Sequence, residues 1–330
     1  MTDWSIEEQT YTKPSPLQGL LQSQLRLSER TISLLVPLVI FLVALLPRIL
    51  GLNTFITADE DDQIMFASHF LKSMLSGNFG GALVLGYPGV PTLILGAGGV
   101  AARYLAHYMD WYSLPWVTAD FMTTLEQTTT RFGYFDYPLD FLAWVRLPMV
   151  IVAALAIMGI YLMIRQLINE QVALITAIIL AFDPFILAHS RVIHVDAPMS
   201  YLMFLSCLAF LLYLERGRWY WLILSGLFGG LAGISKTPAA LLGPILVLAG
   251  ISFVLFPPPG QPRAIRWRRL AIALIVWGLV AVVAIFTFWP SMWSRPVYAL
   301  QWIINNLVSV NQGAHPTTGI FWNDWQSDQN

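Results

Sequence analysis

Four consecutive acids form the densest charge in this sequence. The run Asp59–Asp62 follows directly on an apolar stretch that is long enough to cross a bilayer. Carboxylates in that place can act as a general base or hold a divalent cation. They can also form a simple polar helix start, because acids in a first turn are favoured by the helix dipole. A helix turns by about 100° per residue, so at most two of the four can face one pocket.

A second polar cluster lies in residues 182–202, which read FDPFILAHSRVIHVDAPMSYL. Arg191 and His194 are three residues apart and share one face if the segment is helical. The guanidinium of Arg191 can grip a phosphate, or it can reach out to lipid headgroups. Asp196 opens the next helix before Pro198, as a capping residue or as part of a site. His194 is either a structural histidine or a cavity residue.

Lys236 is the third candidate, at the end of the glycine-rich stretch GGLAGISK. Small residues of this kind allow neighbouring helices to approach closely. Membrane proteins concentrate Lys and Arg in their cytoplasmic loops, so a lone lysine on the other side needs a reason. Anion binding is one reason, and an exposed turn lysine is the alternative.

The composition indicates a membrane protein. Of 330 residues, 57% are hydrophobic and 11% are charged, and the mean hydropathy is +0.64. Soluble domains carry about 25% charged residues. The net charge of −1 does not suggest nucleic acid as a partner. The single cysteine, Cys207, lies in an apolar run, which excludes a disulfide framework and indicates a packing role.

Seven apolar segments are candidate transmembrane helices of an all-α polytopic bundle. An eighth apolar segment, 87–108, is rich in glycine and holds two prolines. If it rests at the outer interface and the N-terminus is cytoplasmic, the basic clusters ERGRW and RAIRWRR both lie inside, as the charge bias requires. If it crosses, both clusters lie outside. The predicted spans are therefore 31–52, 147–166, 171–188, 197–214, 219–235, 238–256 and 270–289.

This topology divides the chain into three parts. Residues 1–30 form a cytoplasmic segment with a surface-lying amphipathic helix. Residues 31–289 form the transmembrane domain, with a long outer loop at 53–146 that bears interfacial helices. Within that loop, the apolar residues of DQIMFASHFLKSMLSG recur on one helical face. Residues 290–330 form an extracytoplasmic segment that we expect to continue into a longer protein.

The topology gathers most of the unusual polar residues on one face, at the outer ends of the spans. A charge at the bilayer centre costs about 2.5–3.5 kcal/mol on insertion scales, so charges kept at span ends indicate partners or a function. Carboxylates and phosphate-binding cations on one membrane surface suit group transfer from a lipid phosphate. Besides the acidic run, the residues are Arg48, Arg146, Asp183, Arg191, His194, Asp196 and Lys236.

Four motifs, in this order, resemble the polyprenyl-phosphate-dependent glycosyltransferases of the GT-C superfamily, in particular the protein O-mannosyltransferases and lipid A aminoarabinose transferases. The resemblance covers about residues 31–330. It rests on the Asp-Glu pair in TADEDDQ, the proline-bearing GYPGVPTLILGAGG, the pair WVRLPMV and DPFILAHSRVIHVDA, and GLFGGLAGISKTP.

The resemblance implies an inverting sugar transfer without a covalent intermediate. It implies Asp59 as the base on the acceptor hydroxyl, with Glu60 supporting it or joining a metal site. Asp61 and Asp62 are then the solvated start of a helix. Tyr87 stands where some members of the superfamily place a basic residue or a histidine.

By the same resemblance, Arg191 and Lys236 contact the donor phosphate. Three further residues are expected in the cavity, namely Asp196, His194 and Arg146. A divalent cation is left open as a cofactor, with Glu60 and Asp196 as candidate ligands.

We therefore expect a multi-pass glycosyltransferase of the plasma (inner) membrane, with its active site outside the cytoplasm. Its partners are the bilayer, a polyprenyl-phosphate sugar and a protein, lipid or glycan acceptor. The alternatives are a lipid or solute transporter and a truncated, noncatalytic membrane subunit. Transporters often show internal repeats and discontinuous helices, which this sequence does not indicate.

Overall fold

The computed structural model describes residues 34–57, 59–83, 88–109, 120–130, 139–256 and 263–311. These residues form helices and connecting turns, without a strand in the described ranges. The expectations for the N-terminal segment 1–30, for Tyr87 and for residues 312–330 lie outside the described part.

Four described helices are long and apolar enough to cross a membrane. They are α5 (Leu139–Leu167), α8 (Asp196–Arg216), η2 with α10 (Thr237–Leu241 and Leu242–Leu255) and α11 (Arg263–Phe288). Three shorter apolar helices coincide with the other predicted spans: Leu34–Ile49, α6 (Glu170–Phe182) and α9 (Trp219–Gly233). The predicted all-helical membrane fold is thus confirmed, and the number of helices that cross stays a prediction.

The predicted span 171–188 is wrong at its end, because the helix breaks at Asp183. There α6 ends and the short helix α7 (Pro184–His189) begins. Asp183 Oδ1 accepts a hydrogen bond from the N–H of Ile186 at 2.9 Å, so it caps α7. A residue before proline is disfavoured in helical geometry, which explains the break before Pro184. The break separates the polar segment that follows from the apolar helix.

The predicted start of the second span is also wrong, because α5 begins at Leu139 and contains Arg146 and Pro148. Proline has no N–H, so the helix leaves the carbonyl of Trp144 without its usual donor. Here α3 (Val90–Tyr108) comes very close, since a Cβ on its Gly99 would lie 2.6 Å from the Trp144 oxygen. Glycine permits this approach, which holds α3 against α5 next to Arg146.

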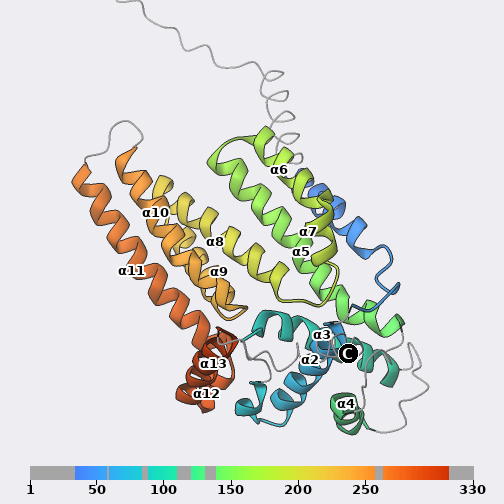
Figure 1. The fold of residues 1–330 in the computed structure, drawn as a ribbon. Coiled ribbons are helices and arrows are strands. Elements are labelled where there is room, and N and C mark those ends of the chain that lie inside the picture. The colour runs from blue at the N-terminus through green and yellow to red at the C-terminus, as the bar shows by residue number, and fades with distance from the viewer. Residues whose placement is uncertain are drawn as a thin grey trace, which may run out of the picture.

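A cap of shorter helices covers one end of the bundle, as Figure 1 shows. One of them is α2 (Glu60–Leu75), and the apolar face predicted for it is confirmed at Ile64 and Ala67, which are fully buried. Helix α3 is not among the four described helices that are long and apolar enough to span a membrane, and its place at the interface stays a prediction. The other cap elements are η1 (Phe79–Ala82), α4 (Phe121–Thr130), α12 (Ser291–Ser294) and α13 (Pro296–Asn311).

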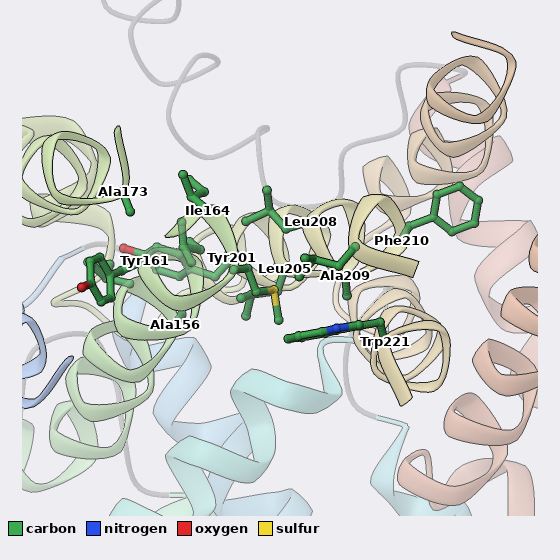
Figure 2. Packing of buried hydrophobic residues seen from close by; sticks show 14 of the residues in the cluster. Ala156, Tyr161, Ile164, Ala173, Tyr201, Leu205, Leu208, Ala209, Phe210 and Trp221 are labelled. Carbon is green, nitrogen blue, oxygen red and sulfur yellow. The ribbon is translucent and has the colours of Figure 1, made fainter. Parts of the chain in front are cut away.

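The apolar core of the bundle centres on α8, which packs between α5 and α9. Figure 2 shows Tyr201 and Leu205 of α8 lying between Ala156 of α5 and Trp221 of α9. Burying each large apolar side chain of this kind contributes about 1.5–3 kcal/mol. The core thereby fixes the end of α8 that carries Asp196.

The basic clusters lie at the far end of the same helices. Arg216, at the end of α8, donates to the Gln166 side chain at 3.0 Å, next to the end of α5. Arg269, near the start of α11, donates to the carbonyl of Tyr213 at 2.7 Å. The acids and the basic clusters thus occupy opposite ends of the bundle, as the topology requires, and the orientation in the membrane stays a prediction.

Candidate active site

Glu60 and Arg146 form the buried centre of the site. Arg146 Nε donates to Glu60 Oε1 at 2.7 Å, and Nη2 donates to Oε2 at 2.5 Å. The two side chains are 1% and 3% exposed. Arg146 also donates to the carbonyls of Leu52 at 2.6 Å and Phe55 at 2.5 Å. A bidentate pair has a fixed geometry, so it ties the start of α2 to α5 and to the segment after the first helix.

Further N–H and O–H groups occupy the Glu60 carboxylate. The N–H of Ile193 donates to Oε1 at 3.1 Å. The N–H and the hydroxyl of Thr57 donate to Oε2 at 2.9 and 3.0 Å. The spacing Thr-x-x-Glu is a signal in the sequence that would have found Thr57, although Asp59, and not Thr57, is the N-cap of α2. Glu60 therefore joins α2 to the connection between α7 and α8, a placement suited to supporting its neighbour Asp59.

Asp59 lies immediately before α2, and its side chain is 76% exposed. It occupies the N-cap position, but its carboxylate makes no capping hydrogen bond. Its Oδ2 lies 3.8 Å from His194 Nε2. The carboxylate is therefore available at the rim of the site rather than spent on its own helix.

Asp196 and Lys236 form a second ion pair beside Asp59. Lys236 Nζ lies 2.8 Å from Asp196 Oδ1, and both side chains are about a third exposed. Asp196 Oδ2 lies 3.3 Å from His194 Nδ1. Asp59, His194, Asp196 and Lys236 therefore form a continuous row of neighbouring side chains. An Asp59 isolated in bulk water, far from the other three, would have contradicted the site hypothesis.

The start of α3 holds this row together. The N–H groups of Gly89 and Val90 donate to the carbonyls of the two residues before Lys236, at 3.1 and 3.0 Å. The first N–H groups of a helix have no partner within it, so the Lys236 turn satisfies them. Thr92 Oγ1 donates to the carbonyl of His194 at 3.3 Å. One helix thus positions two segments that lie far apart in the sequence.

A cavity of about 260 Å³ adjoins the buried ion pair, and Arg146, Arg191 and His189 help to line it. The Arg191 guanidinium donates to the carbonyl of Leu50. Burial, and then the charges of Arg146 and Arg48, lower the pKa of Arg191. Positive charge concentrated in a hollow attracts anions, so this cavity suits an anionic group.

Arg48 belongs to the scaffold of the site. It is fully buried and donates to Ser190 Oγ at 2.8 Å. It also donates to the carbonyls of Leu180 at 3.0 Å and Ala181 at 3.1 Å, near the end of α6. Carbonyls at a helix end need donors, and a cation there is favoured by the dipole.

A second cavity, of about 300 Å³, adjoins Asp196 on the side of α5, α6 and α7. His189 lines both cavities, although the sequence did not single it out. Its place five residues before His194 was the available signal. The other lining residues are mostly apolar: Ile160, Leu180, Phe185, Ile186, Ala197, Ser200, Tyr201 and Phe204.

The structure places the predicted site residues at one end of the bundle, but the expectation for Asp61 is wrong. Asp61 is 7% exposed, whereas Asp62 is exposed as expected. The helical turn carries Asp61 to the side of buried Glu60 and leaves Asp62 outside. The seven predicted residues at that end are Asp59, Glu60, Arg146, Arg191, His194, Asp196 and Lys236.

The two carboxylates proposed as metal ligands are both engaged with protein groups. Glu60 is bound by Arg146, Ile193 and Thr57, and Asp196 pairs with Lys236. Within the described ranges, no group of three His, Cys, Asp or Glu side chains is placed to hold a metal. These contacts do not present Glu60 and Asp196 as a ready ligand set.

None of the curated proteins compared with the chain matches it. Residues 141–293 match the family of dolichyl-phosphate-mannose-protein mannosyltransferases. The matched stretch covers somewhat less than half of the chain and includes Arg146, Arg191, Asp196 and Lys236. The match supports what the ordered motifs predicted, that the chain belongs to the GT-C superfamily of membrane glycosyltransferases.

Proposed function

We propose that this protein transfers a sugar from a polyprenyl-phosphate donor to an acceptor hydroxyl, with inversion and with Asp59 as the base. The observation that carries the proposal is the position of Asp59. Its exposed carboxylate lies 3.8 Å from His194, which contacts the Asp196–Lys236 pair. A carboxylate and cationic groups thus lie together at one end of a bundle of apolar helices, which supports the proposal.

In the proposed reaction, the acceptor oxygen attacks the anomeric carbon of the donor sugar. The bond between that carbon and the phosphate oxygen breaks, and polyprenyl phosphate leaves with the bonding electron pair. Asp59 takes the proton of the acceptor hydroxyl as the new bond forms. Because the sugar passes directly between two oxygens, one displacement inverts the anomeric centre.

The departing phosphate needs compensation for its charge, and we assign this to Arg191 and Lys236. Arg191 lines a cavity of about 260 Å³ and directs its guanidinium at a single carbonyl within the described residues. Lys236 Nζ lies 2.8 Å from Asp196, so its charge is held at the row that includes Asp59. Charge-assisted bonds of this kind are roughly twice as strong as neutral ones.

The lipid part of the donor suits the largely apolar cavity of about 300 Å³ beside Asp196. Phe185, Tyr201 and Phe204 contribute to its wall. A prenyl chain buries apolar surface there, at about 25 cal/mol per Å². Asp196 lies at the polar end of this cavity, where the headgroup would meet the reacting groups.

Sugar transfer by membranes that contain the full chain tests the proposal. The probes are polyprenyl-phosphate mannose and the corresponding glucose and aminoarabinose donors, each labelled in the sugar. Asp59→Asn is expected to abolish transfer, because an amide does not accept the proton. The matched control is Asp62→Asn, which removes an exposed acid three residues away and leaves transfer intact.

Two outcomes would contradict the proposal. Unchanged turnover in Asp59→Asn removes the base role. A wild-type chain that releases no sugar from any of the donors, but moves the intact labelled lipid between leaflets, supports the transporter alternative instead.

A further inference from the structure

The imidazole of His194 lies between the carboxylates of Asp59 and Asp196. Its Nε2 is 3.8 Å from Asp59 Oδ2, and its Nδ1 is 3.3 Å from Asp196 Oδ2. The ring is 22% exposed, whereas Asp59 is 76% exposed. The more buried side chain is therefore placed to restrain the more exposed one.

We propose that His194 is a positioning residue that orients the Asp59 carboxylate through its Nε2–H and couples it to the Asp196–Lys236 pair. This inference rests on the proposed function, because the carboxylate that His194 orients is the proposed base.

The positioning role requires the tautomer that carries its proton on Nε2, and one backbone group favours it. The N–H of Asp196 donates to His194 Nδ1 at 3.3 Å. If Nδ1 accepts this bond, the ring proton of neutral His194 is on Nε2, which faces Asp59. Asp196 Oδ2 lies at the same distance of 3.3 Å from Nδ1 and would instead accept a bond from an Nδ1–H. The proposal assigns the Nε2–H tautomer. Hydrogen-bond partners of one ring nitrogen commonly decide the role of the other in this way.

Burial favours the neutral ring. Burial is the largest effect and lowers the pKa of His194, and Lys236 and His189 lower it further. Asp196 and Asp59 act in the opposite direction without reversing the shift.

The backbone on both sides of the ring is fixed by groups outside the reaction. The N–H of Ile193 donates to Glu60 at 3.1 Å, and the carbonyl of His194 accepts from Thr92. Ile193 is also fully buried, against Gly96 of α3. The scaffold thus holds His194, and His194 in turn limits the rotamers of Asp59.

The distance of 3.8 Å between His194 Nε2 and Asp59 Oδ2 is long for a hydrogen bond. Such contacts commonly shorten when substrate binds.

Two amide substitutions separate positioning from mere packing. Glutamine places its amide nitrogen near the position of Nε2, whereas asparagine places its amide near Nδ1. We expect His194→Asn to lower kcat by about 10- to 100-fold, since misplacement of a reacting group by about 1 Å has effects of that size. The KM for the donor stays within about twofold, since phosphate contacts remain.

His194→Gln is expected to recover most of kcat. His69→Gln, on the exposed side of α2, is the control.

Two kinetic results would overturn the positioning role. One is an asparagine variant that is as fast as wild type. The other is an equal loss in both amide variants with a raised KM, which indicates a structural role.

A measurement that needs no turnover keeps the inference separate from the proposed function. In the full chain with ¹⁵N-labelled histidine, held in lipid nanodiscs, the signal lost in His194→Gln identifies His194 among the five histidines. We expect the Nε2–H tautomer at neutral pH and a shift of the Nε2 signal on Asp59→Asn. The coupling is refuted if His194 is the Nδ1–H tautomer, or if Asp59→Asn leaves the Nε2 signal of His194 unchanged. If wild type transfers no sugar, the proposed function fails, and this spectrum still decides the coupling.

Discussion

Arg146 in α5 and Glu60 at the start of α2 form a buried, bidentate ion pair, with N–O distances of 2.7 and 2.5 Å. The pair joins segments 86 residues apart and sits directly beside Asp59. It keeps the proposed base in register with α5, and so with the rest of the bundle.

Breaking this pair from one side should be costly. Glu60→Gln leaves the Arg146 charge buried without its carboxylate, and removal of one partner from a buried pair costs about 3–5 kcal/mol. Unfolding of the detergent-solubilised protein measures the loss. Replacing both residues, in Glu60→Met with Arg146→Leu, should recover part of the stability because no unpaired charge remains.

The control for that prediction is Asp62→Asn. Burial, and then the charges of Asp61 and Asp59, raise the pKa of Asp62. Its neutralisation therefore relieves repulsion and should change the stability by no more than about 0.5 kcal/mol, as at most surface sites. Equal unfolding of Glu60→Gln and Asp62→Asn would contradict the role of the ion pair.

Arg191→Gln should weaken donor binding more than it slows the chemical step. A hydrogen bond to a charged group contributes about 1.5–3 kcal/mol, so the KM for the donor rises by about 10- to 100-fold. Initial rates over a range of donor concentrations measure this. Arg216→Gln, at the opposite end of the bundle, serves as the control. A donor KM that is the same in both variants removes Arg191 from the phosphate site.

The contact of α3 with α5 predicts opposite effects for two adjacent glycines. In Gly99→Ala the new Cβ would lie 2.6 Å from the backbone of Trp144 and Val145, so α3 must move and the protein loses about 1–3 kcal/mol. In Gly98→Ala the Cβ meets nothing within 4 Å, and alanine in a helix is about 0.5–1 kcal/mol better than glycine. Thermal unfolding of the two variants compares them directly. Equal melting temperatures would show that α3 is not held at this point.

Acid should destabilise the protein through His194. Because the pKa of His194 is lowered in the folded state, the unfolded chain takes up a proton first as the pH falls below 6.5. The contribution to stability is present above that value and is lost as the pH falls through the lower, folded-state pKa. One proton contributes at most about 1.4 kcal/mol per pH unit. His194→Gln should reduce the slope of the melting temperature against pH.

His69 offers a comparison for this effect, because burial and Lys72 lower its pKa as well. His69→Gln should remove a separate part of the slope. If His194→Gln keeps the full wild-type slope between neutral and acidic pH, His194 is not buried as a neutral ring.

The orientation of the bundle can be tested with single cysteines. After Cys207→Ser removes the one native thiol, Asp62→Cys should react with a membrane-impermeant maleimide added outside intact cells. Arg268→Cys, exposed at the opposite end, should react only after the membrane is opened. The basic cluster of residues 263–269 predicts this by the positive-inside bias. Labelling of Arg268→Cys in intact cells would reverse the topology.

The sequence by itself determined the class of the fold and the end of the bundle where the polar residues meet. Apolar runs report directly on burial in a bilayer, and the charge bias selects one topology. The seven predicted spans therefore correspond to seven apolar helices. The errors fall at their ends, at Asp183 and Leu139, because capping and proline effects decide helix ends locally while hydropathy averages over them.

Only the tertiary structure decided which acid does what. The run Asp59–Asp62 is uniform in sequence, but the contacts that distinguish Glu60 from Asp59 come from distant segments, apart from the local contact of Thr57 with Glu60. Arg146, Ile193 and Thr57 occupy Glu60, while Asp59 is left at the rim beside His194. The long-range contacts join residues that are about 86 to 135 positions apart in the sequence, so they depend on how the helices pack. Packing follows from the shapes of the side chains that meet, which no local sequence pattern encodes. For the same reason the link from Asp59 through His194 to Lys236 became visible only in the folded chain.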